Sequence, residues 1–320
     1  MDRLQRWPQI ATLFALSLAL GYLAWLGWGL LPSQQVAPQD GFDGERALAL
    51  AQDQCDIGPR PAGSPEDWRT ADMILEQLQR QGWETAAEEY AVGSKQLRNV
   101  AGMAGSEGPL LVIATHYDTR SRSDRDSDPA RRTQPTLGAN DGASGVATLL
   151  ELARALDTSR LQLRVWLLFL DGEADAGLAA WDESSGARHF IEGRHPSAVI
   201  YLNMVGATDA QFATVPDATD LLQTQLWRLA KRLGYEDRFI AGPGPIIEDA
   251  HTVFLRAGIP TAEIIQSDYP YARTTEDDCD KLDAGTLKDV GALLESYLEN
   301  NDFLTIAPSL QSPMPQTPSP

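Results

Sequence analysis

Imidazole, carboxylate and amide side chains accompany four short apolar runs in this sequence. Such groups serve as metal ligands and general bases, so a site that contained them could polarise a carbonyl group and activate water. Taken singly, each has a plainer explanation, because an Asp before Gly often makes a turn and an Asp before a helix often caps it. Their recurrence at four runs predicts one shared site. The runs and their polar residues are 110–115 with His116 and Asp118, 163–170 with Asp171 and Glu173, 198–205 with Asn203, and 261–265 preceded by Asp249 and His251.

Helical patterns alternate with these apolar runs. A further acidic residue, Asp141, lies at the predicted start of a helix over residues 145–156. Buried apolar strands that alternate with helices predict an α/β fold, a three-layer sandwich in which a mainly parallel mixed β-sheet is flanked by helices. Ligand sites of such sheets form beyond the carboxyl ends of the strands. The other helices are predicted over residues 68–80, 221–233 and 286–298, from apolar spacing typical of one helical face.

The chain has 320 residues and a formal net charge of −19. A strongly acidic chain lacks the basic face that nucleic acids require, so nucleic-acid binding is excluded as a function. We predict one folded domain over residues 43–300. Residues 301–320 are predicted to form a disordered, Pro-rich tail. The composition leaves the oligomeric state open.

The N-terminal segment has the composition of a membrane anchor. No charged residue occurs from Ile10 to Leu31, a run of 22 residues, which is long enough for a helix to cross a bilayer. Arg3 and Arg6 precede the run, so the positive-inside rule places the N-terminus in the cytoplasm and the domain in the periplasm or outside the cell. A cleaved signal peptide is the alternative, which the length of the run and the lack of a small-x-small cleavage motif disfavour. The predicted order is 1–8 cytoplasmic, 9–31 transmembrane and 32–42 a polar linker.

Two cysteines, Cys55 and Cys279, occur in the chain. They lack the close spacing of cysteine metal ligands. In an oxidising compartment outside the cytoplasm they could form a disulfide, although sequence spacing does not decide the pairing.

An ordered series of motifs gives the chain a family resemblance. It resembles the zinc-dependent aminopeptidases and glutaminyl-peptide cyclotransferases over residues 43 to about 300, and it looks closest to the cyclotransferases over residues 248–260. The resemblance implies a shared α/β fold, zinc as the cofactor, and peptide or protein N-termini as substrates. The motifs that carry it are at residues 58–64, 115–118, 138–147, 171–173 and 269–282.

The resemblance also implies roles for single residues. A metal ligand, a residue that orients it and a general base would together polarise the substrate and move its proton. An acid beside the base and a pocket aromatic complete the set. The implied roles are His116 as a metal ligand, Asp118 as the residue that orients it, Asp141 as the carboxylate that binds one metal or bridges two, Glu173 as the general base or proton shuttle, Asp249 as the acid in its hydrogen-bond network, and Trp181 as the pocket aromatic.

Three positions depart from the family pattern. Ala174 replaces a ligand carboxylate, Asn203 replaces a ligand aspartate, and Arg273 replaces a ligand histidine. Alanine and arginine have no lone pair to donate, and zinc sites seldom use a neutral amide. The metal of a single-zinc cyclotransferase would use positions 141, 174 and 273, of which Asp141 alone survives. The second metal of the aminopeptidases would use His116, Asp141 and Asn203, a set that could hold zinc weakly or not at all.

Other residues of the sequence could replace the lost ligands and charge. Asp175 is the candidate substitute ligand, and His251 is a weaker one. We predict that Arg273 supplies the positive charge in place of the metal and pairs with Asp141 or Glu173, since clustered acids without a cation repel one another. The alternative is that Arg273 points to solvent.

The sequence is compatible with two functions. The retained residues indicate a membrane-anchored metallopeptidase-family hydrolase or cyclase of peptide N-termini, with ordinary zinc catalysis impaired or lost. The alternative is a pseudoenzyme, a fully non-catalytic peptide-binding or scaffold ectodomain on the same fold. A serine hydrolase is disfavoured because Ser144 lacks the nucleophile-elbow spacing. The charged loop over residues 120–132 is interpreted as solvated surface at the border of the pocket.

Overall fold

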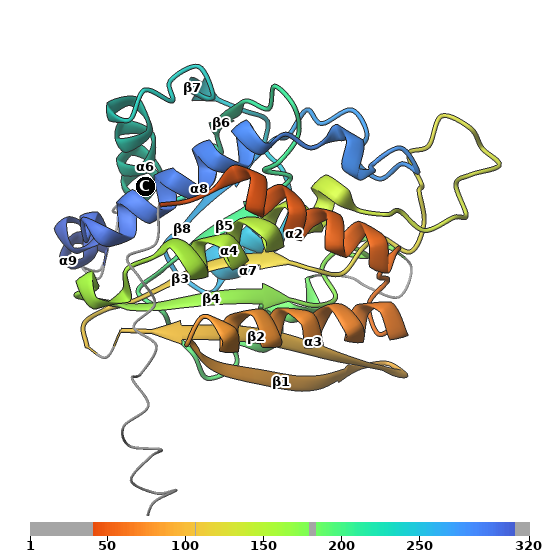
Figure 1. Ribbon diagram of the computed structural model, residues 1–320, viewed down its shortest axis with the longest axis horizontal. Coiled ribbons are helices and arrows are strands. Elements are labelled where there is room, and N and C mark those ends of the chain that lie inside the picture. Colours follow the sequence, from red (N-terminus) through yellow and green to blue (C-terminus); the bar gives the residue numbers. More distant parts are fainter. Residues whose placement is uncertain (1–40, 106, 179–183, 311–320) are drawn as a thin grey trace, which may run out of the picture. The chain divides into compact units, whose positions relative to one another are not determined.

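The computed structural model describes residues 41–105, 107–178 and 184–310. Their centre is a six-stranded sheet with the strand order β1-β2-β4-β3-β5-β8 (Figure 1). A separate two-stranded sheet joins β6 to β7. The strands are β1 Glu84–Val92, β2 Lys95–Ala104, β3 Leu110–His116, β4 Arg164–Leu170, β5 Ala198–Asn203, β6 Phe212–Thr214, β7 Phe239–Pro243 and β8 Thr261–Ile265.

The central sheet has a parallel half and an antiparallel edge. Strand β3 pairs in parallel with β4 and β5, and β5 pairs in parallel with β8. The hairpin β1–β2 adds an antiparallel edge through β2 and β4. The four predicted apolar strands are thus confirmed as β3, β4, β5 and β8, while the half-exposed hairpin strands are additional. The predicted mainly parallel mixed sheet is confirmed.

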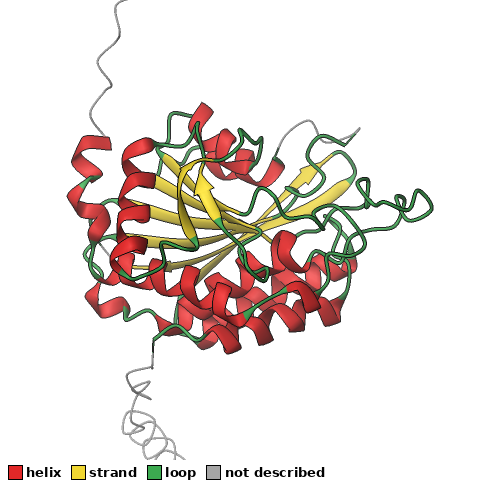
Figure 2. Cartoon of the chain, turned by 90° about the horizontal axis from the view of Figure 1, so that it is seen from above, coloured by secondary structure: helices red, strands yellow, loops and turns green. Residues whose placement is uncertain are grey.

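Helices cover both faces of the sheet, which gives the predicted three layers (Figure 2). Alternate residues of β3 divide between the layers, because Leu111 and Ile113 pack into one apolar cluster and Val112 and Ala114 into the other. Helices α3, α4 and α8 contribute to the first cluster, and α5 and α7 to the second. The helices are α2 Gly44–Ile57, α3 Pro65–Arg80, α4 Ser144–Ala155, α5 Ser185–Ile191, α6 Asp220–Arg232, α7 Ala250–Arg256, α8 Ala284–Glu299 and α9 Ala307–Leu310.

Side-chain caps fix where several helices begin. Ser64 accepts a hydrogen bond from the main chain of Asp67 at the start of α3, and a proline occupies the first position of that helix. Asp283 caps α8 by accepting from Thr286 N at 2.7 Å. The four helices predicted from sequence are present within a few residues of their expected bounds.

The ends of the predicted domain differ from expectation. Phe42, placed in the linker, is 5% exposed and lies in the main core against Gly291 of α8. Residues 301–310, placed in the disordered tail, form the short helix Asp302–Thr305 and α9 and bury Phe303 completely. Both differences have the same cause, because burial of the aromatic side chains of Phe42 and Phe303 stabilises the folded state.

Membrane anchoring was predicted for residues 9–31, which lie outside the described part of the chain. Within the described ranges, no helix is long and apolar enough to cross a membrane.

Cys55 and Cys279 are joined by a disulfide across 224 residues of sequence. The bond ties the end of α2 to the short helix Cys279–Lys281. That short helix follows the segment that carries Arg273, so the disulfide anchors one wall of the candidate site.

Candidate functional site

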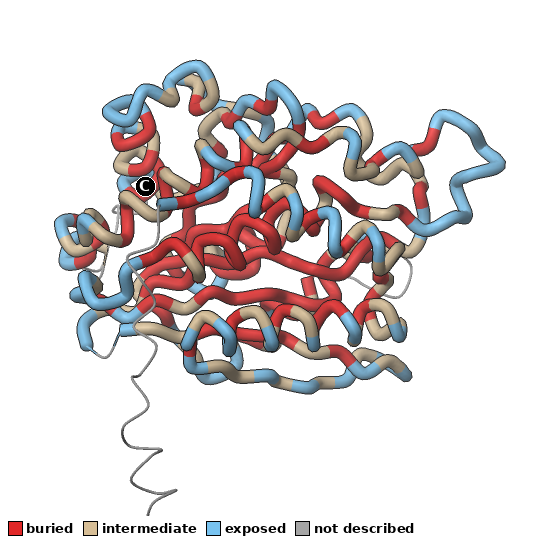
Figure 3. The backbone as a smooth tube through the Cα atoms, in the orientation of Figure 1, coloured by how far each residue is buried: buried red, intermediate tan, exposed pale blue. Residues whose placement is uncertain are grey.

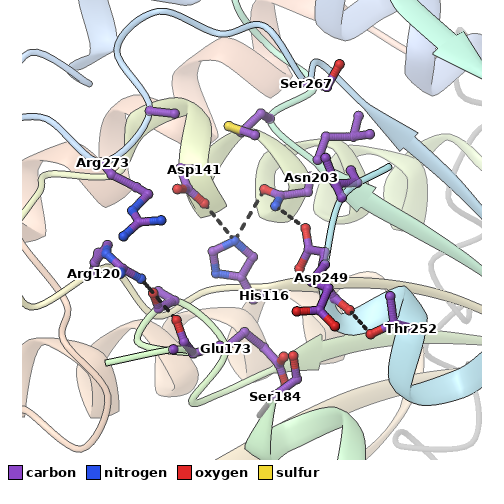
Figure 4. A pocket seen from close by; sticks show the side chains of 18 of the residues that line it. His116, Arg120, Asp141, Glu173, Ser184, Asn203, Asp249, Thr252, Ser267 and Arg273 are labelled. Atoms are coloured by element: carbon purple, nitrogen blue, oxygen red, sulfur yellow. Dashed lines mark hydrogen bonds and ion pairs between the residues drawn. The ribbon is translucent and has the colours of Figure 1, made fainter. Parts of the chain in front are cut away.

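A cavity of about 500 Å³ opens beyond the carboxyl ends of the parallel strands. His116 ends β3, Asn203 ends β5, and Glu173 follows β4 by three residues. Figure 4 shows these side chains directed toward one pocket, with Arg120 and Arg273 on one side and Asp249 on the other. The sheet therefore brings together the polar residues that the sequence separates.

The first part of the pocket, which we call the histidine half, consists of His116, Asp141, Asn203 and Asp249. His116 Nε2 lies 3.1 Å from Asp141 Oδ1 and 3.4 Å from Asn203 Oδ1. Asn203 Nδ2 donates to Asp249 Oδ2 at 2.5 Å. The amide thus links the imidazole to the Asp249 carboxylate.

His116 is held at both ring nitrogens. Its Nδ1 lies 3.0 Å from the main-chain oxygen of Asp118, which can only accept, and its Nε2 faces the carboxylate of Asp141. Burial opposes a charge on this ring, but hydrogen bonds with the Asp118 and Asp141 carboxylates outweigh burial and raise the pKa of His116 well above its ordinary value. Both ring nitrogens thus face oxygen acceptors, which favours the protonated form of the ring.

A kinked segment positions Asp141. The π-helical turn Ala139–Ala143 has non-helical angles at Asp141 and at Gly142, whose φ is 145°. A Cβ on Gly142 would lie 2.9 Å from the main-chain oxygen of His116, so this position requires glycine. The buried Asp277 carboxylate accepts from Asn140 N at 2.9 Å and from Asp141 N at 3.2 Å. Burial and the charge of Asp141 raise the pKa of Asp277 to about 7.

Asp118 connects the imidazole to the base. Its carboxylate accepts from Glu173 N at 3.2 Å and Ala174 N at 2.9 Å, and its Oδ1 lies 3.4 Å from His116 Nδ1. The residue expected to orient His116 therefore also fixes the turn that presents Glu173.

Glu173 is buried at the floor of the pocket. Its Oε1 accepts from Ala187 N at 2.8 Å, while its Oε2 accepts no hydrogen bond from any residue of the described ranges. Burial raises the pKa of Glu173 to about 8, although hydrogen bonds from the Ser184 side chain and Ala187 N lower it, and the charges of Asp118 and Asp249 act in the same direction as burial. A carboxyl group with a free oxygen and a pKa near neutrality can take up and return a proton.

The second part of the pocket, the arginine half, consists of Arg120, Asp124 and Arg273. Arg273 Nε donates to Asp124 Oδ1 at 2.9 Å and its Nη2 pairs with Asp124 Oδ2. Arg120 donates to the same carboxylate, from Nε to Oδ1 at 2.8 Å and from Nη2 to Oδ2 at 3.2 Å. Although burial raises it, hydrogen bonds from Arg273 and Arg120 lower the pKa of Asp124 to about 2.

The predicted partner of Arg273 was therefore wrong. Its guanidinium pairs with Asp124 rather than with Asp141 or Glu173, because a bidentate fit to one carboxylate is available in the neighbouring loop. The alternative that it points to solvent is also wrong, since the Arg273 side chain lines the pocket and is 30% exposed. Its positive charge still acts on Asp141, whose pKa is lowered in spite of burial by His116 first and by both arginines after it.

The loop over residues 120–132 differs from the solvated surface that was predicted. Its outer part is exposed (Figure 3), but Arg120 is only 5% exposed and donates from Nη1 to Ala174 O at 2.6 Å. Asp126 accepts from the main chain and the hydroxyl of Thr275, at 3.0 and 2.6 Å. Arg273 has a positive φ of 64°, and its carbonyl accepts from Arg125 N at 3.2 Å. Arg120, Asp124 and Asp126 were missed because a run of alternating charges resembles any solvated loop.

Three further candidates do not reach the pocket or are not described. Asp175, the proposed substitute ligand, is turned away and accepts from Ser121 N at 2.8 Å. His251 is fully buried, its Nδ1 lies 2.9 Å from Glu263 Oε2, and it does not line the cavity. Trp181 lies outside the described residues. Ser144 is also buried and donates to Asn140 O at 2.7 Å, a structural role.

The donor set does not fit the zinc of the family. Position 174 offers a methyl group, position 273 offers a cation, and Asn203 offers a neutral oxygen whose amide nitrogen is committed to Asp249. No group of three His, Cys, Asp or Glu arranged to hold a metal ion is found among the residues that the structure describes. The His116 imidazole and the Asp141 carboxylate instead form a hydrogen bond with each other.

Comparisons with known proteins agree with this fold. The profile of peptidase family M28 matches residues 99–298. Bovine glutaminyl-peptide cyclotransferase is 27% identical over 285 residues, covering 75% of this chain and 77% of that protein. Two solved structures superpose with a TM-score of 0.75 and cover 82% of this chain and 99% of their own: a glutaminyl cyclase of Bacteroides thetaiotaomicron, 28% identical, and a Zn-dependent exopeptidase of Parabacteroides distasonis, 27% identical. The chain belongs to peptidase family M28.

Proposed function

We propose that this protein recognises the free N-termini of peptides or proteins outside the cytoplasm, from a membrane anchor, and that it has lost the ordinary zinc catalysis of its family. The observation that carries the proposal is the identity of positions 174 and 273. They hold an alanine and an arginine, and the arginine is fixed in the pocket by Asp124. A guanidinium at a ligand position has no lone pair for zinc and repels a metal ion bound directly beside it.

The acidic groups that remain suit recognition of an amine. Glu173 and Asp249 both line the pocket, and Glu173 keeps one carboxylate oxygen without a partner in the described residues. A buried unpaired acceptor costs free energy until a donor reaches it, so an α-ammonium or α-amino group would be stabilised there.

Retention of Glu173 favours a second candidate function, metal-independent cyclisation of N-terminal glutamine. The α-amine would attack the γ-carboxamide carbon, Glu173 would accept the amine proton and return it to the leaving nitrogen, and ammonia would depart. The raised pKa of Glu173 supports this role. An arginine would polarise the carbonyl less strongly than zinc, so slow turnover is expected.

The test is the metal content of the purified full-length protein by mass spectrometry, together with aminopeptidase and glutamine-cyclisation assays. We expect less than stoichiometric zinc and no zinc-dependent turnover. Stoichiometric zinc with turnover that Glu173→Gln abolishes would defeat the proposal. Turnover that survives chelation but is lost in Glu173→Gln would select the second candidate.

A restoration experiment sharpens the result. The double variant Ala174→Glu with Arg273→His supplies the two missing ligands, and zinc is expected to bind it. The matched control, Ala174→Gln with Arg273→Gln, has similar side-chain volumes without the ligand groups and is expected to bind none. Failure of the first variant to gain zinc would mean that the two substitutions alone do not explain the loss.

A further inference from the structure

The pocket carries opposite charges on its two sides. Arg120, Arg125 and Arg273 line the cavity together with Glu173 and Asp249. In Figure 4, Arg120 and Arg273 lie on one side, Asp249 lies on the other, and Glu173 lies below them. A pocket that only received an N-terminal amine would need the acidic groups alone. The arginines therefore indicate a second, anionic group on the ligand.

The arginine side retains binding capacity after its internal pairing. Asp124 takes the Nε and Nη2 groups of both Arg120 and Arg273, so two cations share one anion. Arg273 Nη1 makes no hydrogen bond to any residue within the described ranges, and Arg125 is exposed there and forms no ion pair with a described acid. Guanidinium groups pair with planar carboxylates through parallel hydrogen bonds, which makes a carboxylate the best-matched anion.

Glu173 and Asp249 are the acidic residues that a cation in the cavity would meet. Glu173 is 6% exposed, and its Oε2 is itself buried, with no hydrogen-bond partner among the described residues. The Arg273 side chain also lines the cavity, where it is 30% exposed.

The size of the cavity limits the ligand. About 500 Å³ lies in the range of small-molecule sites, and both charged sides border the same space. An extended protein N-terminus has its next carboxylate far from its amine, whereas a free amino acid or dipeptide brings the two within one pocket.

We infer that the ligand is a small zwitterion, a free amino acid or a dipeptide, whose carboxylate binds Arg273 and whose ammonium binds Glu173. This inference rests on the proposed recognition of free amines and narrows it. It assigns Arg273 to the carboxylate of the ligand rather than to the structure of the loop alone.

The experiment uses the full-length protein in detergent with EDTA and calorimetry with three probes. They are the dipeptide Gln-Ala, its C-terminal amide, and its N-acetyl form. The dipeptide is expected to bind about tenfold or more tightly than the amide, since a charge-assisted pair contributes roughly that ratio. The N-acetyl form is expected to bind weakly.

Variants separate the inference from simple loss of folding. Arg273→Gln should bring the affinity for Gln-Ala down to that for the amide and leave the amide unchanged, and Arg273→Lys should keep part of the difference. Arg80→Gln, on the exposed Arg80–Glu76 pair of α3, is the matched control and should change neither. Melting temperatures check that each variant is folded.

Each outcome of these binding measurements supports or overturns the zwitterion inference. Equal affinity of wild type for the dipeptide and its amide overturns the zwitterion while the proposed amine recognition stands. An equal loss of both affinities in Arg273→Gln also overturns it. No binding of any probe by a folded protein overturns the zwitterion and the proposed function together.

Discussion

The histidine half and the arginine half of the pocket pair their charged side chains in different ways. In the histidine half, the carboxylate of Asp141 faces the imidazole of His116, and Asn203 bridges to Asp249. In the arginine half, two guanidinium groups hold one carboxylate, Asp124. The histidine half thus has two carboxylates for one imidazole, whereas the arginine half has two guanidinium groups for one carboxylate.

The difference lies in where the partners come from. In the histidine half, His116 and Asn203 end strands, so the sheet fixes their positions, and Asp141 and Asp249 lie just before α4 and α7. The arginine half joins two loops, over residues 120–132 and 272–277, and its geometry depends on contacts between them. Residues on strands keep their positions when side chains change, whereas a loop pair is only as rigid as its links.

The largest expected effect comes from removing the disulfide. Cys55→Ser with Cys279→Ser should lower the free energy of unfolding by about 2–5 kcal/mol, because a closed loop of this length restricts the unfolded chain. Urea denaturation measures the loss. Hydrogen exchange should rise more in residues 272–277 than in 114–118. Equal changes in the two segments would contradict the dependence of the arginine half on this bond.

Removing the shared carboxylate should have the next largest effect. Asp124→Asn leaves two guanidinium groups with a neutral partner and should cost about 1.5–3 kcal/mol of folding stability. Because the folded pKa of Asp124 is lowered to about 2, the wild-type contribution is present above about pH 4 and is lost as the pH falls through 2. Thermal unfolding across this range should show that loss in wild type and not in the variant. Asp128→Asn, at an exposed pair of the same loop, is the control and should change stability little.

A charge added to the histidine half should have a smaller effect. Asn203→Asp places a second carboxylate at the position that lies 2.5 Å from Asp249 and should cost about 1–2 kcal/mol, since like charges there cannot both be ionised. Added zinc should restore the melting temperature by binding the folded state. Asn300→Asp, at the exposed end of α8, is the control and should not respond to zinc. Loss of stability without any zinc response would show that the histidine half is no longer a metal site even with its aspartate.

The smallest expected effect concerns the two buried acids Asp67 and Asp171. Burial and the charge of Asp171 raise the pKa of Asp67, and burial with the charge of Asp118 raises that of Asp171. Raised folded values mean that this contribution is fully present below about pH 4 and is lost as the pH rises into the alkaline range. The pH dependence of this contribution to folding stability is therefore opposite in sign to that of Asp124.

Asp67→Asn should therefore flatten the alkaline loss of stability by about 1 kcal/mol. The Asn side-chain oxygen can still accept from Gly63 N, which donates to Asp67 at 2.9 Å in the wild type. Thermal unfolding between pH 5 and pH 9 measures the slope. Asp72→Asn, at an exposed pair on the same helix, should keep the wild-type slope. If the Asp67→Asn variant kept the wild-type slope of stability against pH, Asp67 and Asp171 would not cause the loss of stability at alkaline pH.

The strand ends explain why much of the site was predictable. A buried parallel strand is a continuous apolar run, so β3, β4, β5 and β8 are visible in the sequence, and the residues just after them must share one edge. The positions of His116, Asp118, Glu173 and Asn203 follow from that rule. The hairpin β1–β2 was not visible, because its strands are half-exposed and mix charged with apolar residues.

The sequence by itself determined the fold class, the family and the chemical identity of each ligand position, because these depend on periodicity and residue type. Ala174 and Arg273 lack lone pairs in any conformation. Tertiary structure alone decided that Arg273 pairs with Asp124, that Arg120 is buried, that Asp175 and His251 turn away, and that Phe42 and Phe303 belong to the core. A charged side chain pairs with whichever opposite charge the folded backbone brings within reach, and sequence separation does not encode that distance.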